Sequence, residues 1–117
     1  MHTSRALFAA VLALLAAGCG KPVPPDKAAY VGEWQQPAMY LLITADGSVS
    51  YKRLKGGATT SVDAPLKKFD GDNFEAGVGP MSTVFVVSKP PYQVDGKWKM
   101  VVDGVELTRT HDLGSSK

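Results

Sequence analysis

Residues 97–109, KWKMVVDGVELTR, carry the clearest structural signal in this sequence. Apolar and polar side chains alternate on both sides of Asp103-Gly104, which is typical of two strands that each bury one face. Glycine has no Cβ atom, so an Asp-Gly pair adopts the positive φ angles of a two-residue hairpin turn at little cost. We therefore predict a β-hairpin whose buried side chains pair across the turn. The predicted pairs are Val102 with Val105, Met100 with Leu107, and Trp98 with Arg109.

The same turn signal recurs along the chain. Asp-Gly occurs four times, and the short apolar runs between the turns show no sustained helical period. Strands spaced this closely are typical of antiparallel sandwiches and barrels. We predict an all-β domain, a small antiparallel β-barrel or closed sandwich of about eight strands. Besides the last hairpin, the predicted strands are residues 30–35, 39–44, 49–54, 59–62, 66–69, 73–76 and 83–87.

The turn at Asp46-Gly47 allows two registers for the strands beside it. A two-residue turn would leave most apolar side chains of residues 39–44 facing outward. A three-residue loop over 45–47, with Gly47 left-handed, places the apolar side chains of both strands on one face. Because a slip of one residue exchanges the two faces, we predict the three-residue loop. The residues that then share the buried face are Met39, Leu41, Ile43, Val49 and Tyr51.

Two features depart from simple alternation. Residues 84–87, VFVV, are apolar throughout, which predicts a strand covered on both faces. Proline has no backbone N–H, so we expect Pro65 to break strand pairing and Lys89-Pro90-Pro91 to end a strand and begin a stiff connection.

The N-terminal residues differ in composition from this strand-rich region. His2 and Arg5 precede an apolar run over residues 6–17, which ends just before Cys19, the one cysteine of the chain. A helix that spans a bilayer takes about 20 apolar residues, so this run of about 12 is too short. Its length and its basic start are typical of a signal peptide.

Residues 14–19, LLAAGC, resemble the lipobox of bacterial lipoproteins. The resemblance implies cleavage between Gly18 and Cys19 and attachment of lipid, palmitate included, to the Cys19 thiol. The protein would then be anchored to a membrane by that lipid. Since Gly20 rather than Asp follows the cysteine, the resemblance favours the outer membrane, facing the periplasm, with the inner membrane as the alternative. An ordinary secretory signal is the other interpretation of this stretch.

The domain organisation follows from these signals. We expect a signal peptide over 1–18, a lipidated Cys19 with a flexible tether over 19–29, a β-barrel domain over 30–110 and a disordered tail over 111–117. Three prolines lie between residues 22 and 25, and their fixed φ angle favours an extended tether.

Gly32-Glu33-Trp34 resembles the Gly-x-Trp signature of lipocalins and related small barrels. In that family the tryptophan lies on the first strand and plugs the closed end, and an arginine on the last strand stacks over it. The resemblance implies a structural closure formed by Gly32, Trp34 and Arg109, which would tie the first strand to the last. A guanidinium over an indole contributes about 0.5–2 kcal/mol. The alternative is that Trp34 is an ordinary core aromatic residue.

Charge and composition argue against several functions. The net charge of +2 falls to +1 when Arg5 is removed, and charges of both signs alternate, so no nucleic-acid partner is expected. His111 is the only histidine beyond residue 18 and has no cysteine partner, so we expect no enzyme, no metal site and no cofactor. Asp70, Asp72 and Glu75 lie close together around one turn. Acidic residues at turns more often hydrogen-bond the turn backbone than bind calcium, so we expect no calcium site there.

Two function classes are left by this reasoning. The first is a non-enzymatic envelope lipoprotein that binds a protein partner through strand faces around Tyr40, Tyr51 and Tyr92, since tyrosine is common at interfaces. The alternative is a carrier or sensor of a small apolar ligand inside the barrel. The interior volume discriminates between them, because a ligand cavity takes about 300 Å³ or more.

Overall fold

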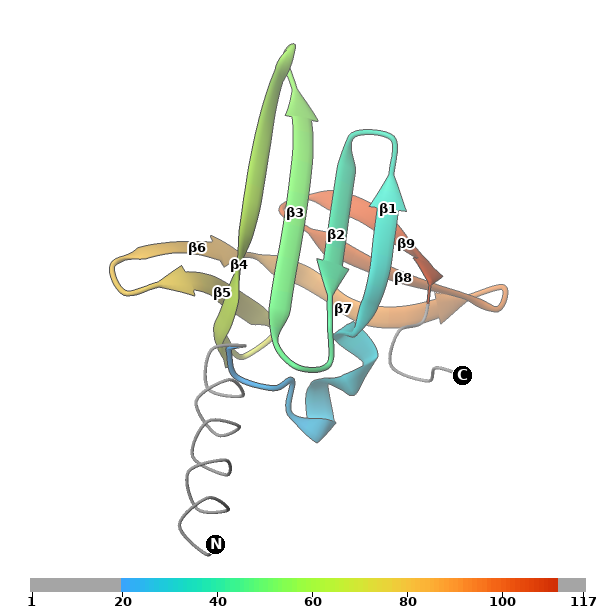
Figure 1. Ribbon diagram of the computed structural model, residues 1–117. Helices are drawn as coiled ribbons and strands as arrows, with labels where there is room; N and C mark the ends of the chain where they lie inside the picture. The colour runs from blue at the N-terminus through green and yellow to red at the C-terminus, as the bar shows by residue number, and fades with distance from the viewer. Residues whose placement is uncertain (1–19, 112–117) are drawn as a thin grey trace, which may run out of the picture.

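The computed structural model describes residues 20–111, which form an all-β domain (Figure 1). Nine antiparallel strands form one curled sheet, a half-barrel, and a short 3-10 helix precedes them. No helix within residues 20–111 has the length and apolar character needed to cross a bilayer. The elements are η1 (Pro25–Tyr30), β1 (Gly32–Gln36), β2 (Met39–Ile43), β3 (Ser48–Lys55), β4 (Ala58–Asp70), β5 (Asn73–Val78), β6 (Met81–Phe85), β7 (Val87–Val94), β8 (Lys97–Val102) and β9 (Val105–His111).

The strand order in the sheet is β6-β5-β4-β3-β2-β1-β9-β8-β7. The first strand therefore pairs with the last in the middle of the sheet, with Trp34 opposite Arg109. The two ends of the sheet are β6 and β7, and only Val86 separates them in the chain. Because one continuous segment forms both ends, the sheet has to curl back on itself, as Figure 1 shows where β7 passes behind β2 and β1.

The two registers that the sequence predicts are confirmed. In the β2–β3 hairpin Ile43 lies opposite Val49 and Leu41 opposite Tyr51, with Gly47 left-handed at φ +95°. All five side chains predicted for the inner face are buried. In the β8–β9 hairpin the pairs predicted nearest the turn form as expected, with two consecutive positive φ angles at Asp103 and Gly104.

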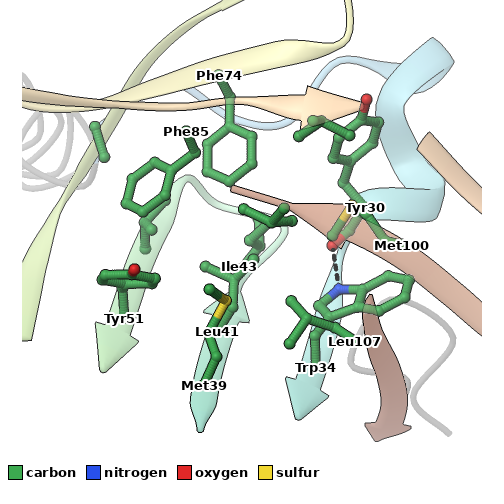
Figure 2. Close-up of a cluster of buried hydrophobic side chains, with 14 of the residues drawn as sticks. Tyr30, Trp34, Met39, Leu41, Ile43, Tyr51, Phe74, Phe85, Met100 and Leu107 are labelled. Atoms are coloured by element: carbon green, nitrogen blue, oxygen red, sulfur yellow. Dashed lines mark hydrogen bonds between the residues drawn. The ribbon is translucent and has the colours of Figure 1, made fainter. Parts of the chain in front are cut away.

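Aromatic rings fill the inner side of the half-barrel (Figure 2). The rings of Phe74 and Phe85 stack with centroids 4.8 Å apart, and the Tyr51 ring meets Phe85 edge-on at 5.0 Å. Tyr30, at the end of η1, packs edge-on against Phe69 at 5.0 Å. The 3-10 helix therefore contributes to the core and is not a peripheral turn.

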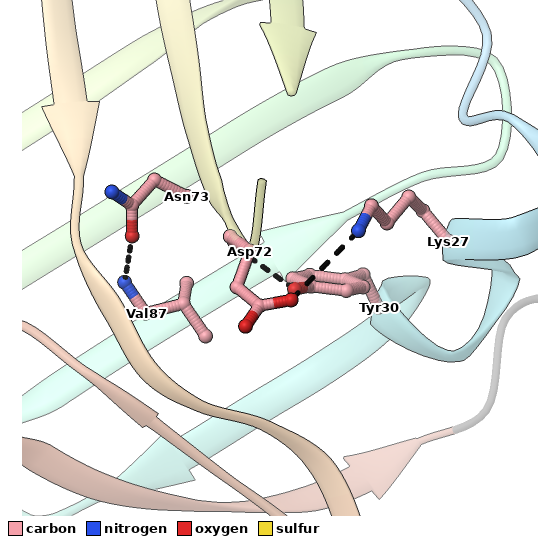
Figure 3. A network of polar contacts seen from close by, with 5 residues as sticks. All are labelled: Lys27, Tyr30, Asp72, Asn73 and Val87. Atoms are coloured by element: carbon pink, nitrogen blue, oxygen red, sulfur yellow. Dashed lines mark hydrogen bonds and ion pairs between the residues drawn. The ribbon is translucent and has the colours of Figure 1, made fainter. Parts of the chain in front are cut away.

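A small polar network holds η1 against the β4–β5 turn (Figure 3). The Tyr30 hydroxyl donates to the backbone carbonyl of Asp72 at 2.8 Å. Lys27 forms an ion pair with the Asp72 carboxylate at 3.9 Å. Beside it, the Val87 amide donates to the Asn73 side-chain carbonyl at 2.7 Å, which fixes the start of β7.

The prolines do not interrupt the strands as predicted. Pro65 lies inside the 13-residue strand β4, opposite Ser48, at the point where β4 exchanges its partner β3 for β5. Pro90 and Pro91 lie inside β7, whose pairing with β8 shifts register on both sides of Lys89. Both sites tolerate a missing backbone N–H. Pro65 lies where β4 changes its partner strand, and Pro90 and Pro91 lie on β7, an edge strand.

The prediction that residues 84–87 are covered on both faces is wrong. Val84 and Val86 are 56% and 50% exposed, whereas Phe85 and Val87 are buried. The reason is the position of β6 at the end of a single sheet, where only the inner face meets the core. Four consecutive apolar residues here mark an uncovered edge.

The segment expected to be a flexible tether is instead attached to the domain from Gly20 onward. The Lys21 amide donates to the Leu66 carbonyl at 3.2 Å, and the Val23 amide donates to the Ala45 carbonyl at 3.1 Å. Val23 also packs against the core. The prolines fit this arrangement because Pro25 occupies the first position of η1, where no backbone donor is required.

Candidate functional site

A shallow groove of about 500 Å³ crosses the outer face of β2, β3 and β4. Tyr40 lies opposite Lys52, and Lys52 lies opposite Ser61, so these three side chains form a row across the strands. Ser50 and Asp63 form the next pair on the same face, two residues along each strand. The groove therefore presents an aromatic ring, an ammonium group, a carboxylate and two hydroxyls on the side of the sheet away from the core.

Tyr40 is held in place at one wall of the groove. Its hydroxyl donates to Glu33 Oε2 at 2.8 Å, and Thr110 Oγ1 donates to Glu33 Oε1 at 3.1 Å. Partial burial raises the pKa of Tyr40, and the hydrogen bond to Glu33 and the charge of that carboxylate raise it further. The phenol thus stays protonated, and the ring offers a fixed face to a ligand in the groove.

A second hollow of about 160 Å³ continues the groove along β3. It shares Tyr40 and Lys52 with the first and extends to Pro37 and Leu54. Leu54 is 52% exposed, although it is a large apolar side chain. The combined surface therefore runs from an apolar end at Leu54 to a charged end at Asp63.

The three tyrosines named from the sequence have different environments. Tyr40 lines the groove, as described above. Tyr51 borders it, but its ring points into the core against Phe85. Tyr92 lies on β7, four strands from β2, and donates its hydroxyl to Glu106 at 2.8 Å, which raises the pKa of Tyr92. The structure therefore does not bring Tyr92 into one surface with Tyr40.

The structure brings together the residues expected to form the closure. Trp34 is fully buried and donates its indole N–H to the Tyr30 carbonyl at 2.9 Å. The Arg109 guanidinium carbon lies 5.7 Å from the Trp34 ring centroid and 5.1 Å from that of Trp98. Gly32 begins β1 with a φ of +146°, an angle that favours glycine. The arginine is therefore enclosed by two indoles, which connect β1, β9 and β8.

Two of the acidic residues around the β4–β5 turn, Asp72 and Glu75, have partners in the protein. Asp72 pairs with Lys27, and Glu75 accepts a hydrogen bond from Ser82 and lies 3.7 Å from Lys67. The Ser82 hydrogen bond is the main reason that the pKa of Glu75 is lowered. Among residues 20–111, no three His, Cys, Asp or Glu side chains converge as a metal site requires.

A basic hollow of about 260 Å³ lies where the described chain begins. Lys21, Lys67 and Lys68 line it together with apolar groups of Leu66 and Phe69. The lipidation residue Cys19 and the cleavage residue Gly18 lie outside the described residues, so their predicted roles stay predictions. Their neighbour Gly20 packs closely against Gly47, whose carbonyl oxygen would lie 2.6 Å from a Cβ on residue 20.

Sequence reasoning did not find the charged half of the groove. The sequence does not predict that Lys52 and Asp63 share a face, because residue 63 falls between a predicted short strand and Pro65. Pairing β3 with β4 over the full length of the hairpin, from Ala58 to Pro65, would have placed them on one face.

Comparisons of this chain with protein-family models, curated proteins and solved structures found no match.

Proposed function

We propose that this chain is a lipid-anchored bacterial envelope lipoprotein that binds a protein partner and catalyses no reaction. The proposal places it at the outer membrane, facing the periplasm, with the lipid on Cys19 as its contact with the membrane. The lipobox resemblance of residues 14–19 supports the location. The outer-face groove with its fixed Tyr40 is the single observation that supports the binding role.

The chemistry of the groove suits an extended peptide segment. Tyrosine combines a large apolar ring with a polar tip and is enriched at protein interfaces. Lys52 and Asp63 offer one charge of each sign, and Ser50 and Ser61 offer hydroxyl groups. A peptide carrying an acidic residue near Lys52 and a basic residue near Asp63 would complement both charges.

The alternative is a carrier of a small apolar ligand in a lipocalin-like barrel. The contact of Arg109 with Trp34 favours the lipocalin-like part of this proposal. The inner side of the half-barrel argues against the carrier, because Trp34, Phe74 and Phe85 fill it and are at most 1% exposed. A ligand would have to displace one of these side chains, so we favour the proposal of a protein partner.

The anchor and the groove are tested separately. Cys19→Ser should abolish incorporation of labelled palmitate and leave the precursor uncleaved. A Cys19→Ser chain that is still acylated and processed would overturn the envelope lipoprotein proposal. Gly20→Asp tests membrane choice in an enteric host, because the resemblance implies retention in the inner membrane fraction. Gly20→Ala is the matched control, since it adds the same Cβ beside Gly47 without the carboxylate and should leave the location unchanged.

The groove is tested by site-specific photo-crosslinking in intact cells. A photoreactive residue in place of the exposed Ser61 should yield a discrete adduct with one protein, whereas the same residue at the exposed Ser88 on β7 should not. Lys52→Glu should reduce the adduct about tenfold, the effect of losing about 1.4 kcal/mol. The matched control Lys97→Glu, an exposed lysine on β8, should leave it unchanged. Equal adducts from both positions, or none from Ser61, would contradict the binding role.

A further inference from the structure

The two end strands of the sheet differ in how their edges are protected. β7 contains Pro90 and Pro91, which lack donors, and its register shifts twice beside the charged Lys89. Prolines, charges and irregular pairing are the devices by which proteins prevent strands from adding to an edge. β6, with the sequence MSTVF, contains no proline and no charge, and its ladder with β5 is regular. Only one of the two edges is therefore left competent for pairing.

The register of β6 defines which backbone groups are open. The two-residue turn Gly79-Pro80 makes Val78 and Met81 the first hydrogen-bonded pair, and bonded pairs then alternate along an antiparallel ladder. Ser82 and Val84 consequently direct their N–H and C=O groups away from β5. The N–H and C=O of Val86 also point away from β5, but both are hydrogen-bonded to Asp103.

Asp103 therefore ends the open edge. The Val86 amide donates to Asp103 Oδ1 at 3.0 Å, and the Asp103 amide donates to the Val86 carbonyl at 2.7 Å. Within residues 20–111, the open edge that follows from this register consists of two donors and two acceptors, at Ser82 and Val84. Apolar side chains surround it, with Met81 78% exposed and Val78 67% exposed at the turn.

We propose that a second copy of this chain pairs with this edge, β6 against β6, antiparallel about a two-fold axis at Thr83. Each Ser82 then lies opposite Val84 of the other copy, and the four donors and four acceptors of the two edges form four hydrogen bonds. Ser82 and Val84 share a face, so the two cores lie on the same side of the joined sheet. Met81 lies opposite Phe85 of the other copy, which reduces its exposure.

A second copy fits this edge better than another strand would. The occupant needs two donors and two acceptors at the same spacing on an uncharged strand, and β6 itself has that set. The prolines of β7 prevent β6 from adding head-to-tail to β7 of another copy, so the contact is isologous and closes at two chains. Glu75, on the neighbouring strand β5, pairs with Lys67 within one copy and does not oppose the approach.

Disulfide formation tests the proposed register in the full chain, purified in detergent micelles. Opposite Cβ atoms at a non-hydrogen-bonded antiparallel pair lie about 4.5–5.5 Å apart, close to the distance a disulfide needs. Thr83→Cys should therefore give a covalent dimer of twice the chain mass under mild oxidation. Ser88→Cys, exposed and outside the edge, should not. The unsubstituted chain controls for Cys19, its only cysteine.

A proline at Val84 tests the same edge without relying on a crosslink. The Val84 N–H points away from β5, so Val84→Pro removes an open donor and leaves the β5–β6 ladder intact. Val84→Pro should weaken dimerisation at least about tenfold by sedimentation equilibrium, because the two-fold axis doubles the loss to two hydrogen bonds. Val84→Thr keeps the N–H and should dimerise normally.

A purified chain that stays monomeric at about 100 μM, far above the dissociation constants usual for specific complexes, would overturn the proposal. So would equal dimerisation of the two Val84 variants, or crosslinking through Ser88→Cys alone.

Discussion

Replacing Arg109 by methionine should destabilise the fold by about 1.5–3 kcal/mol. Trp98 is half-buried, and its cation–π contact with the guanidinium contributes about 0.5–1 kcal/mol. Trp34 is fully buried and Arg109 is half-buried, so this contact is partly desolvated and contributes more, about 1–2 kcal/mol. Methionine retains an unbranched apolar side chain of similar length, so the loss measures the guanidinium rather than missing volume.

The assay is urea unfolding of the purified chain, followed by far-ultraviolet circular dichroism. Each tryptophan is substituted singly and together with Arg109→Met, in two double-mutant cycles. Fluorescence is unsuitable, because the chain has two tryptophans and both are substituted in these cycles. Trp34→Phe has a second cost of about 1–3 kcal/mol, because it also leaves the Tyr30 carbonyl without its donor. The strength of each contact is therefore measured by the coupling energy between that tryptophan and Arg109, and not by the stability loss of any single variant.

We expect a coupling of about 1 kcal/mol or more for Arg109 with Trp34, and a smaller one with Trp98→Leu. Lys97→Met removes an exposed cation from the neighbouring strand and should change the free energy of unfolding by at most about 0.5 kcal/mol. Losses that add to within about 0.3 kcal/mol in both cycles would refute the idea that the enclosed guanidinium holds these strands together.

Three other variants probe the turns and the 3-10 helix. Gly47→Ala should cost at least about 1–3 kcal/mol in urea unfolding, because a Cβ at φ +95° would stand 2.2 Å from the Lys21 carbonyl oxygen. Burial raises the pKa of Tyr30 to about 12, so the stability it contributes is complete below its ordinary pKa near 10 and lost as pH rises through 12. Tyr30→Phe should flatten that alkaline loss. Asp103→Ala removes the acceptor of the Val86 amide and should speed its hydrogen exchange about tenfold.

Local turn chemistry explains why the hairpins could be predicted. At Gly47 and Gly104 the turn residue and the apolar alternation select the same register, so each hairpin is specified within about a dozen residues. The effects predicted for Pro65 and Pro90 are wrong, because the cost of a missing backbone donor depends on how the strand is paired at that residue. The partners of β4 and β7 are their neighbours in the chain. That β4 changes partner at Pro65 and that β7 is an edge strand follow instead from the complete strand order, which no local pattern contains.

The candidate site was predictable only in part, for the same reason. Tyr40 stands out by residue type, but its fixed position depends on other strands. Glu33 accepts the hydrogen bond of its hydroxyl, and Thr110 donates to that carboxylate. Val23 lies among prolines, which predict a tether, and Tyr30 begins the apolar runs, which predict a strand. The burial of both side chains comes from contacts with the sheet. The open edge of β6 required the complete strand order.

The pairing of β1 with β9 has a consequence for the order in which the protein folds. The hydrogen bond between Gln35 and Thr110 joins residues 75 positions apart, so nearly the whole domain lies within the loop it closes. Long loops cost conformational entropy before their contacts form, which slows folding. A chain that emerges N-terminus first, from a ribosome or through a membrane pore, therefore leaves Trp34 without its Arg109 contact until its last strand arrives. Premature release without residues 105–111 should give a protease-sensitive chain with an unfinished core.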